Sequence, residues 1–422
     1  MSQTDARDLV GHLKQVLLDL NAHPYPAIAN PPETPKRASV ALILRIQPHY
    51  AHPQLHPPAP ASHETIDSFF AHDWVQHGDP ELLFIKRATR IGDKWNGHVA
   101  LPGGKRDAED ADDQVTAARE ALEEVGIDLG HDSAIAVGNL PQRVVTTSWG
   151  KVPLMVLCPY LYLLTSPHYP SQRLQPTEVA STHWVPLRAL QSPALRTHEY
   201  ADVSARLARS ELGIKRCFLQ AMLSSMMFAA IRLLPANSTY CATIPAFIPE
   251  APNAASQPPL LLWGLTLGVV SDLLEHIPPH NALELWTYPT FTNWDVRFVM
   301  WALSYRFRSQ KALEMRTTED PATVGTVQEV ADLPGIQEET APEEPGKEGY
   351  RPGEVGIAGL GVGRHWGRTG RVKMLTRGAA VNSMLEGYYP IVRKAVATAL
   401  VGRIAVAALV ATYLWRAYKA SS

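Results

Sequence analysis

Residues 101–127 read LPGGKRDAEDADDQVTAAREALEEVGI. The Pro-Gly-Gly turn at 102–104 lets the backbone approach a ligand closely, because glycine carries no Cβ. Asp112 or Asp113 can cap the helix that follows, and Gly126 can end it. The stretch therefore predicts a glycine loop that runs into a short helix.

Three glutamates of that helix, Glu120, Glu123 and Glu124, are spaced so that their carboxylates share one patch of its surface. Like charges this close repel one another unless a cation lies among them. Hard oxygen donors beside a glycine turn suit Mg²⁺ or Mn²⁺ with a phosphorylated substrate. Taken alone, the ExxEE pattern is also typical of a solvated helix face. Helical periodicity predicts an apolar, buried face away from the glutamates, made by Val115, Ala118, Leu122 and Val125.

The stretch resembles the signature of the Nudix family, G…REUxEExGU, in which U is a bulky apolar residue. The matching residues are Gly104, Arg119, Glu120, Glu123, Glu124, Gly126 and Ile127. Ala121 takes the first U position, and fifteen steps separate Gly104 from Arg119, one more than in the standard signature. Two residues, Glu109 and Asp110, are candidates for the signature's intermediate glutamate.

The longer spacing resembles the coenzyme A diphosphatase branch of the family, in which a GGKxDxxD-type stretch precedes the helix. Flanking sequence resembles that branch too, at Leu82, Leu83, Arg87, Gly97 and residues 99–104, 178–187 and 262–266. The resemblance runs from about Ser39 to about Ile277, with insertions. The whole arrangement, tail included, is most similar to fungal members of unassigned substrate.

This resemblance implies an α/β/α sandwich around a mixed sheet, with insertions. It implies Mg²⁺- or Mn²⁺-dependent hydrolysis of the diphosphate bond in a nucleoside diphosphate-linked metabolite, with coenzyme A or an acyl-CoA preferred. ADP-ribose, NADH or a dinucleoside polyphosphate is the alternative substrate. A non-catalytic Nudix scaffold tethered to a membrane is the alternative of another class.

The resemblance also implies roles for individual residues. Glu120, Glu123 and Glu124 are expected to bind the metal, assisted by the carbonyl of Gly103 or Gly104. Arg119 is expected to orient the carboxylates by ion pairing, because a guanidinium grips a carboxylate bidentately. Glu178 is a candidate general base, or else a surface ion pair. Lys105 and Arg106 are candidates to hold a substrate phosphate.

Composition limits the other functions. The chain has 39 basic and 41 acidic residues in 422, so it lacks the cationic surplus that nucleic-acid binding requires. Its three cysteines, Cys158, Cys217 and Cys241, are too few and too scattered for a disulfide framework or a cysteine-based zinc site. The N-terminus has no secretory signal and reads as an amphipathic helix.

The chain is expected to divide into four parts. Residues 1–36 form a helix and a proline-rich lead, and residues 37–315 form the hydrolase domain with insertions at 47–80 and 190–257. Residues 316–383 form a disordered linker, acidic and then basic, and residues 384–422 form a transmembrane tail. The histidines of the first insertion, His49, His52, His56 and His63, lack spaced acidic or cysteine partners, so a loop is favoured over a metal site.

Apolar runs predict strands at residues 39–46, 81–86 and 179–185, and two strand pieces around Pro159 within 152–164. Residues 218–234 predict a core helix, and residues 260–274 predict a strand that turns into a helix at Gly264.

Residues 395–415 form an apolar stretch of 21 residues with a single charge, Arg403. A helix of that length reaches about 31 Å, which matches the hydrocarbon thickness of a bilayer. Basic residues flank it, and Tyr413 and Trp415 stand near one end. Arg403 favours the alternative of a buried or interfacial helix, because a charge at the centre of a span costs roughly 2.5–3.5 kcal/mol. The stretch predicts a tail anchor with the catalytic domain in the cytosol, at the mitochondrial outer membrane or the peroxisome rather than the endoplasmic reticulum.

Overall fold

The computed structural model describes residues 3–49, 64–89, 96–130, 134–147, 152–201, 225–233, 259–278, 287–319 and 388–421. They belong to two compact units. The first contains the described residues up to Ala201 and those from Met227 to Pro289. The second contains those from Thr290 to Glu319 and from Tyr388 onward. The histidine-rich part of the first insertion, at 50–63, and most of the expected linker, at 320–383, lie outside the described residues.

The first unit is built on a mixed sheet, as expected. Its strands lie in the order β3-β2-β1-β7-β5, with β4 paired to β1, β6 to β7 and β8 to β2. The strands β1 and β7 are parallel, and the other pairs are antiparallel. Their bounds are β1 Arg37–Gln47, β2 Asp79–Arg87, β3 Val99–Ala100, β4 Gly103–Lys105, β5 Ala134–Asn139, β6 Arg143–Thr147, β7 Val152–Leu164 and β8 Val179–Pro186.

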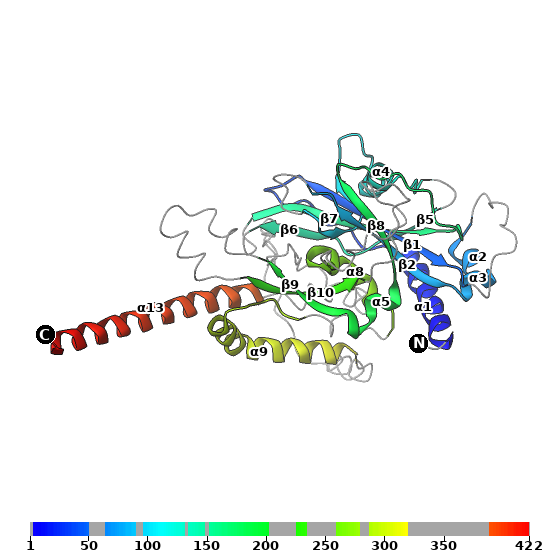
Figure 1. Cartoon of the computed structure of the whole chain (residues 1–422). Helices are drawn as coiled ribbons and strands as arrows, with labels where there is room; N and C mark the ends of the chain where they lie inside the picture. Colours follow the sequence, from blue (N-terminus) through cyan, green and yellow to red (C-terminus); the bar gives the residue numbers. More distant parts are fainter. Residues whose placement is uncertain are drawn as a thin grey trace, which may run out of the picture. The chain divides into compact units, whose positions relative to one another are not determined.

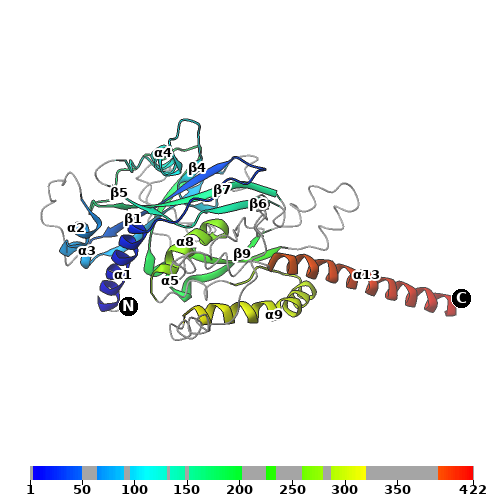
Figure 2. The same ribbon diagram turned by 180° about the vertical axis from the view of Figure 1, so that it is seen from behind.

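Helices lie on both sides of this sheet (Figure 1, Figure 2). On one side, α4 (Asp113–Val125) packs two of its alanines, Ala117 and Ala121, against the strands at Ala41 and Ile43. On the other side lie α8 (Gly264–His276), most of which is buried, and a second sheet in which β10 pairs with β9 and β11. The bounds of that sheet are β9 Arg196–Ala201, β10 Met226–Leu233 and β11 Leu260–Trp263. The expected arrangement of a mixed sheet between helices is confirmed, and the second sheet adds to it.

The remaining helices of this unit surround the sheet. Their bounds are α1 Gln3–Ala22, α2 Ile66–Phe70, α3 Asp73–Gln76, α5 Leu187–Gln191 and the 3₁₀ turn Pro193–Leu195. The expected amphipathic helix at the N-terminus is α1, which buries Leu9, Leu13, Leu17 and Leu20. Between β6 and α8, Arg143 forms an ion pair with Asp272, and both side chains are completely buried.

Two expectations about elements were wrong. The segment 218–234 does not form one helix, because β10 occupies Met226–Leu233; residues 218–224 lie outside the described part. A short, continuously apolar run fits a buried strand as well as a buried helix, so periodicity alone could not separate them. Residues 152–164 form one strand rather than two pieces. Pro159 stands opposite Val40, and its carbonyl accepts a hydrogen bond from the Leu140 amide.

The second unit contains the short strand β12 (Thr290–Phe291) and two long helices, α9 (Trp294–Glu319) and α13 (Tyr388–Ser421). By length and composition, α13 can cross a membrane. Within Tyr388–Ala420, the most apolar segment is long enough for a span, and only 11% of that segment is buried. The apolar stretch identified in the sequence is thus one continuous helix.

Candidate active site

The glycine turn forms the short strand β4, which pairs with the start of β1. Gly103 has a φ of +156°, and a Cβ built on it would lie 2.7 Å from the Cα of Val40. Only glycine allows the chain to pass this close to β1 in this conformation. The backbone amide of Gly103 is thereby left pointing at α4, where it donates a 2.9 Å hydrogen bond to Oε2 of Glu124.

Glu124 is the buried carboxylate of the site, with 2% of its surface exposed. Burial above all, together with the charges of Glu120 and Glu178, raises its pKa to about 8 against the opposing effects of the Gly103 amide and Arg87. A carboxylate held in this environment gains from any positive charge placed beside it. Glu124 therefore combines a fixed position with a strong preference for a nearby cation.

Glu120 lies directly over Gly104. A Cβ on Gly104 would lie 2.5 Å from the carboxyl carbon of Glu120 and 2.6 Å from its Oε2, so the absent side chain makes the room that this carboxylate occupies. Burial raises the pKa of Glu120 as well, and the charges of Glu123 and Glu178 act in the same direction. Glu120 and Glu124 thus both face the glycine strand.

Arg119 joins the helix to the preceding loop. Its Nε and Nη2 bind the two oxygens of Asp110 at 2.9 and 3.0 Å, and Nη2 also donates to the carbonyl of Lys105 and lies 3.1 Å from Glu120. These bonds hold the pKa of Asp110 far below its usual range. The ambiguity between Glu109 and Asp110 is thereby settled: Asp110 is buried against Arg119, and Glu109 is exposed.

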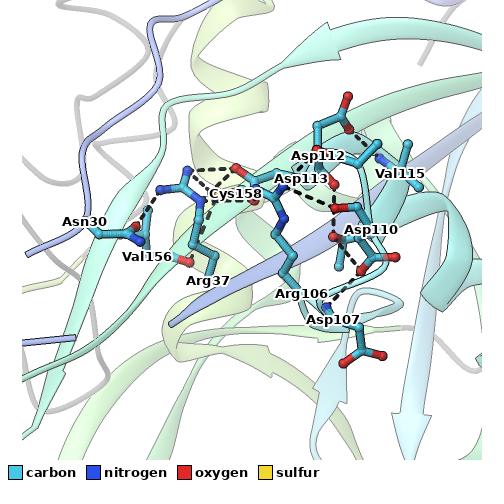
Figure 3. Close-up of polar contacts among 12 residues, drawn as sticks. Asn30, Arg37, Arg106, Asp107, Asp110, Asp112, Asp113, Val115, Val156 and Cys158 are labelled. Carbon is cyan, nitrogen blue, oxygen red and sulfur yellow. Dashed lines mark hydrogen bonds and ion pairs between the residues drawn. The ribbon is translucent and has the colours of Figure 1, made fainter. Parts of the chain in front are cut away.

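The start of α4 is held by two arginines that the sequence analysis did not assign to this role (Figure 3). Asp112 caps the helix by accepting a hydrogen bond from the amide of Val115 at 2.8 Å. Asp113 receives Arg37 at 2.8 Å and Arg106 at 3.4 Å. Arg106 also donates to the carbonyls of the loop before the helix, so the structure directs it to that loop. Gly126 ends the helix in a left-handed conformation, as expected.

The buried face of α4 differs from the expected one. Val115 and Leu122 are 44% and 49% exposed, whereas Ala117 and Ala121 are completely buried. Alanines let the helix lie close to the sheet, and this close approach is what carries Glu124 into the interior. The expected apolar face was therefore wrong at Val115 and Leu122, whereas Val125 is buried and Ala118 packs against the core, as expected.

The other candidate residues are distributed as follows. The side chain of Glu123 is 58% exposed and bonds Nη1 of Arg119 at 3.0 Å, so it points outward from the patch that Glu120 and Glu124 share. Lys105 is exposed at the end of β4. Glu178 directly precedes β8, and its carbonyl accepts a hydrogen bond from the Ala88 amide just beyond the end of β2.

The donor set fits a divalent cation. In the part of the chain that the structure describes, no three His, Cys, Asp or Glu side chains form a ready-made metal cluster. Glu120 and Glu124 nevertheless bring two largely buried carboxylates to the same glycine strand. Carboxylate oxygens are the ligands that Mg²⁺ and Mn²⁺ prefer.

Comparison with known proteins agrees with this geometry. The family model described as the NUDIX domain matches residues 42–207. An uncharacterized protein of Schizosaccharomyces pombe is 35% identical over 277 residues, which cover 64% of this chain and 75% of that protein. Among solved structures, the NUDIX domain of Shewanella oneidensis NrtR complexed with ADP ribose aligns with a TM-score of 0.24 and 19% identity, over 42% of this chain and 86% of that one.

Two shorter matches carry a named activity. The mitochondrial coenzyme A diphosphatase of Mus musculus is 42% identical over 52 residues, which cover 12% of this chain and 25% of that enzyme. The peroxisomal coenzyme A diphosphatase of the same species is 50% identical over 46 residues, or 11% and 19% of the two chains. The family match, the long relative and the site together show that the chain belongs to the Nudix hydrolase family.

Proposed function

We propose that this Nudix hydrolase cleaves the diphosphate bond of coenzyme A or an acyl-CoA with the help of Mg²⁺ or Mn²⁺. The observation that carries the proposal is the pair Glu120 and Glu124, held against Gly103 and Gly104. The one-residue-longer spacing of the signature and the short matches to two coenzyme A diphosphatases support the choice of substrate.

Each residue of the site has its own role in the proposed hydrolysis. Glu120 and Glu124 would hold the cation, with the carbonyl of Gly103 or Gly104 assisting and Glu123 contributing from the outer side. When bound, the cation would neutralise the phosphate oxygens and lower the pKa of the attacking water. Arg119 keeps Glu120 in place through its bonds to Asp110 and the loop. Lys105, exposed at the end of β4, would meet a substrate phosphate.

Glu178 is our candidate general base. It would accept a proton from the attacking water, whose oxygen forms a bond to one phosphorus while the bridging P–O bond breaks. Coenzyme A then yields 3',5'-ADP and 4'-phosphopantetheine. The charge of Glu178 influences both Glu120 and Glu124, which is consistent with a position at the same site.

Incubation of the purified chain with coenzyme A and Mn²⁺ tests the substrate. We expect 3',5'-ADP and 4'-phosphopantetheine, loss of activity in Glu120→Gln and Glu124→Gln, and wild-type activity in the matched variant Glu109→Gln, whose side chain is exposed. Absence of both products would overturn the coenzyme A assignment, and a panel of ADP-ribose, NADH and dinucleoside polyphosphates would then identify the substrate. If Glu124→Gln leaves every detectable hydrolysis unchanged, the catalytic role given to Glu124 is wrong, and the non-catalytic scaffold is favoured instead.

We also propose that α13 anchors the protein in a membrane, with the hydrolase domain (residues 37–315) facing the cytosol. The length and hydropathy of α13 support this. The mitochondrial and peroxisomal names of the two coenzyme A diphosphatases favour the mitochondrial outer membrane or the peroxisome. A chain truncated after Met384 should no longer sediment with membranes. If it still does so, α13 is not the anchor.

A further inference from the structure

One face of α9 carries a row of exposed aromatic side chains. Trp294, Phe298, Trp301 and Tyr305 are 77%, 62%, 55% and 61% exposed. Their spacing of four, three and four residues places them along a single face of the helix. Ring centroids lie 6.2 Å apart between Phe298 and Trp301 and 6.3 Å apart between Trp301 and Tyr305. These four residues are called the aromatic stripe below.

The other face of α9 is buried, at Val296, Met300 and Ser304, each 2% exposed. Its neighbour within the same unit is the first half of α13. Phe307 lies 6.1 Å from Tyr388, ring centroid to ring centroid. Near the opposite end, the first turn of α9 reaches Arg403. The two helices therefore run antiparallel, and among the described residues of this unit the aromatic stripe is exposed.

Arg403 is the single charge of the apolar stretch of α13, and Asp295 of α9 pairs with it. The two side chains meet through both carboxylate oxygens, at 2.5 and 2.6 Å. An arginine within a membrane anchor needs such a counter-charge, because lipid cannot solvate it. The first turn of α9 therefore lies at the same membrane depth as Arg403. Residues 401–420 of α13 are all exposed except Arg403, so Arg403 stands at the start of the part that a bilayer can take up and not at its centre. Arg403 and the first turn of α9 are then at the edge of the bilayer, in the headgroup region.

Beyond Arg403, the surface of α13 is apolar and exposed. Its large exposed side chains from there on are Ile404, Val406, Leu409, Val410, Tyr413, Leu414, Trp415 and Tyr418. The aromatic stripe and this surface thus belong to one unit, with the ion pair between them. If the exposed part of α13 is inserted in a bilayer, the first turn of α9 therefore contacts the surface of that bilayer.

We propose that the aromatic stripe of α9 is a second membrane-contacting surface, which lies in the headgroup region of the bilayer beside α13. The proposal rests on the proposed anchoring by α13 and extends it to a helix that is itself too charged to cross a membrane. Tryptophan and tyrosine favour this region, since one part of each ring system is apolar and another forms hydrogen bonds. Arg297, Arg306 and Arg308 on the same helix suit lipid phosphates.

Quenching of tryptophan emission by brominated lipid tests the proposal on the full chain. The protein is reconstituted into phosphatidylcholine vesicles whose acyl chains carry bromine near the headgroup end, or none. The variant Trp294→Phe/Trp301→Phe keeps the aromatic stripe, and its difference from the wild type isolates the emission of these two residues. Trp415→Phe isolates the signal of α13, and Trp74→Phe, at a buried position of the first unit, serves as the matched control.

We expect brominated lipid to remove most of the emission of Trp294 and Trp301 and of Trp415, and none of that of Trp74. Asp295→Asn should reduce the quenching of Trp294 and Trp301 while Trp415 stays quenched. If only Trp415 is quenched, α13 is the anchor and the proposal for α9 is overturned. If none is quenched, the anchoring by α13 fails too. Sedimentation as a dimer with Trp294 and Trp301 unquenched would assign the aromatic stripe to a second copy of the chain.

Discussion

The empty space above Gly104 is what the carboxylate of Glu120 occupies, so Gly104→Ala is the most direct test of the site. The new Cβ would lie 2.5 Å from the carboxyl carbon, whereas ordinary contact begins at 3.4 Å. The carboxylate must therefore move by about 0.9 Å. Misplacement of a catalytic group by about 1 Å can cost on the order of 10²-fold in rate, or about 2.7 kcal/mol of transition-state stabilisation.

The assay is kcat/KM on coenzyme A with Mn²⁺, together with thermal unfolding of the same samples. Only the end of a flexible side chain has to move, so we expect a fall in kcat/KM of about two orders of magnitude with little change in Tm. Gly130→Ala is the matched control, because its Cβ would meet only Asp128 at an ordinary 3.4 Å. The prediction is refuted if Gly104→Ala keeps the wild-type kcat/KM while Glu120→Gln is inactive. Activity would then not depend on the position of the Glu120 carboxylate over Gly104.

Three further predictions concern stability. Gly103→Ala forces a non-glycine residue to a φ of +156° against the backbone of β1, and should cost about 1–3 kcal/mol in urea denaturation; a cost no larger than that of Gly130→Ala would contradict this. Burial raises the pKa of Glu81 from 4.5 to about 7, so the folded state binds the proton more tightly than the unfolded state. The contribution of Glu81 to the free energy of unfolding is therefore fully present below pH 4.5, and up to about 3 kcal/mol of it is lost as the pH rises through 7. Urea denaturation across that pH range should show this loss in the wild type and not in Glu81→Gln. Asp272→Asn leaves Arg143 buried without its counter-charge and should cost about 3–5 kcal/mol, but Arg143→Met/Asp272→Leu should unfold at a urea concentration equal to or above that of the wild type; equal losses in both variants would show that the charges are not the cause.

Local patterns determined much of the protein. A cap at Asp112 or Asp113 and the end of α4 at Gly126 were predicted from residue type, because both depend on neighbours a few positions away, and the structure has the cap at Asp112. The strands β1, β2 and β8 were predicted from apolar runs, and the turn from strand to helix at Gly264 from the residues around it. The family followed from the signature, since its spacing is itself a chemical constraint.

Contacts between distant segments decided the rest. Periodicity placed Val115 and Leu122 in the core, but the residues of α4 that pack against the sheet are Ala117, Ala121 and Val125. Glu109 and Asp110 are nearly equivalent as sequence, and the hydrogen bonds from Arg119 of α4 to Asp110 separate them.

The tail shows the same division. Its sequence alone determined that residues 395–415 form an apolar helix, and left Arg403 as the argument against an anchor. The counter-charge, Asp295, lies 108 positions earlier in the chain, and no local pattern joins the two. A charge is recognised in a sequence by its residue type, but whether it is neutralised depends on which helix packs beside it, and that is decided only by the tertiary structure.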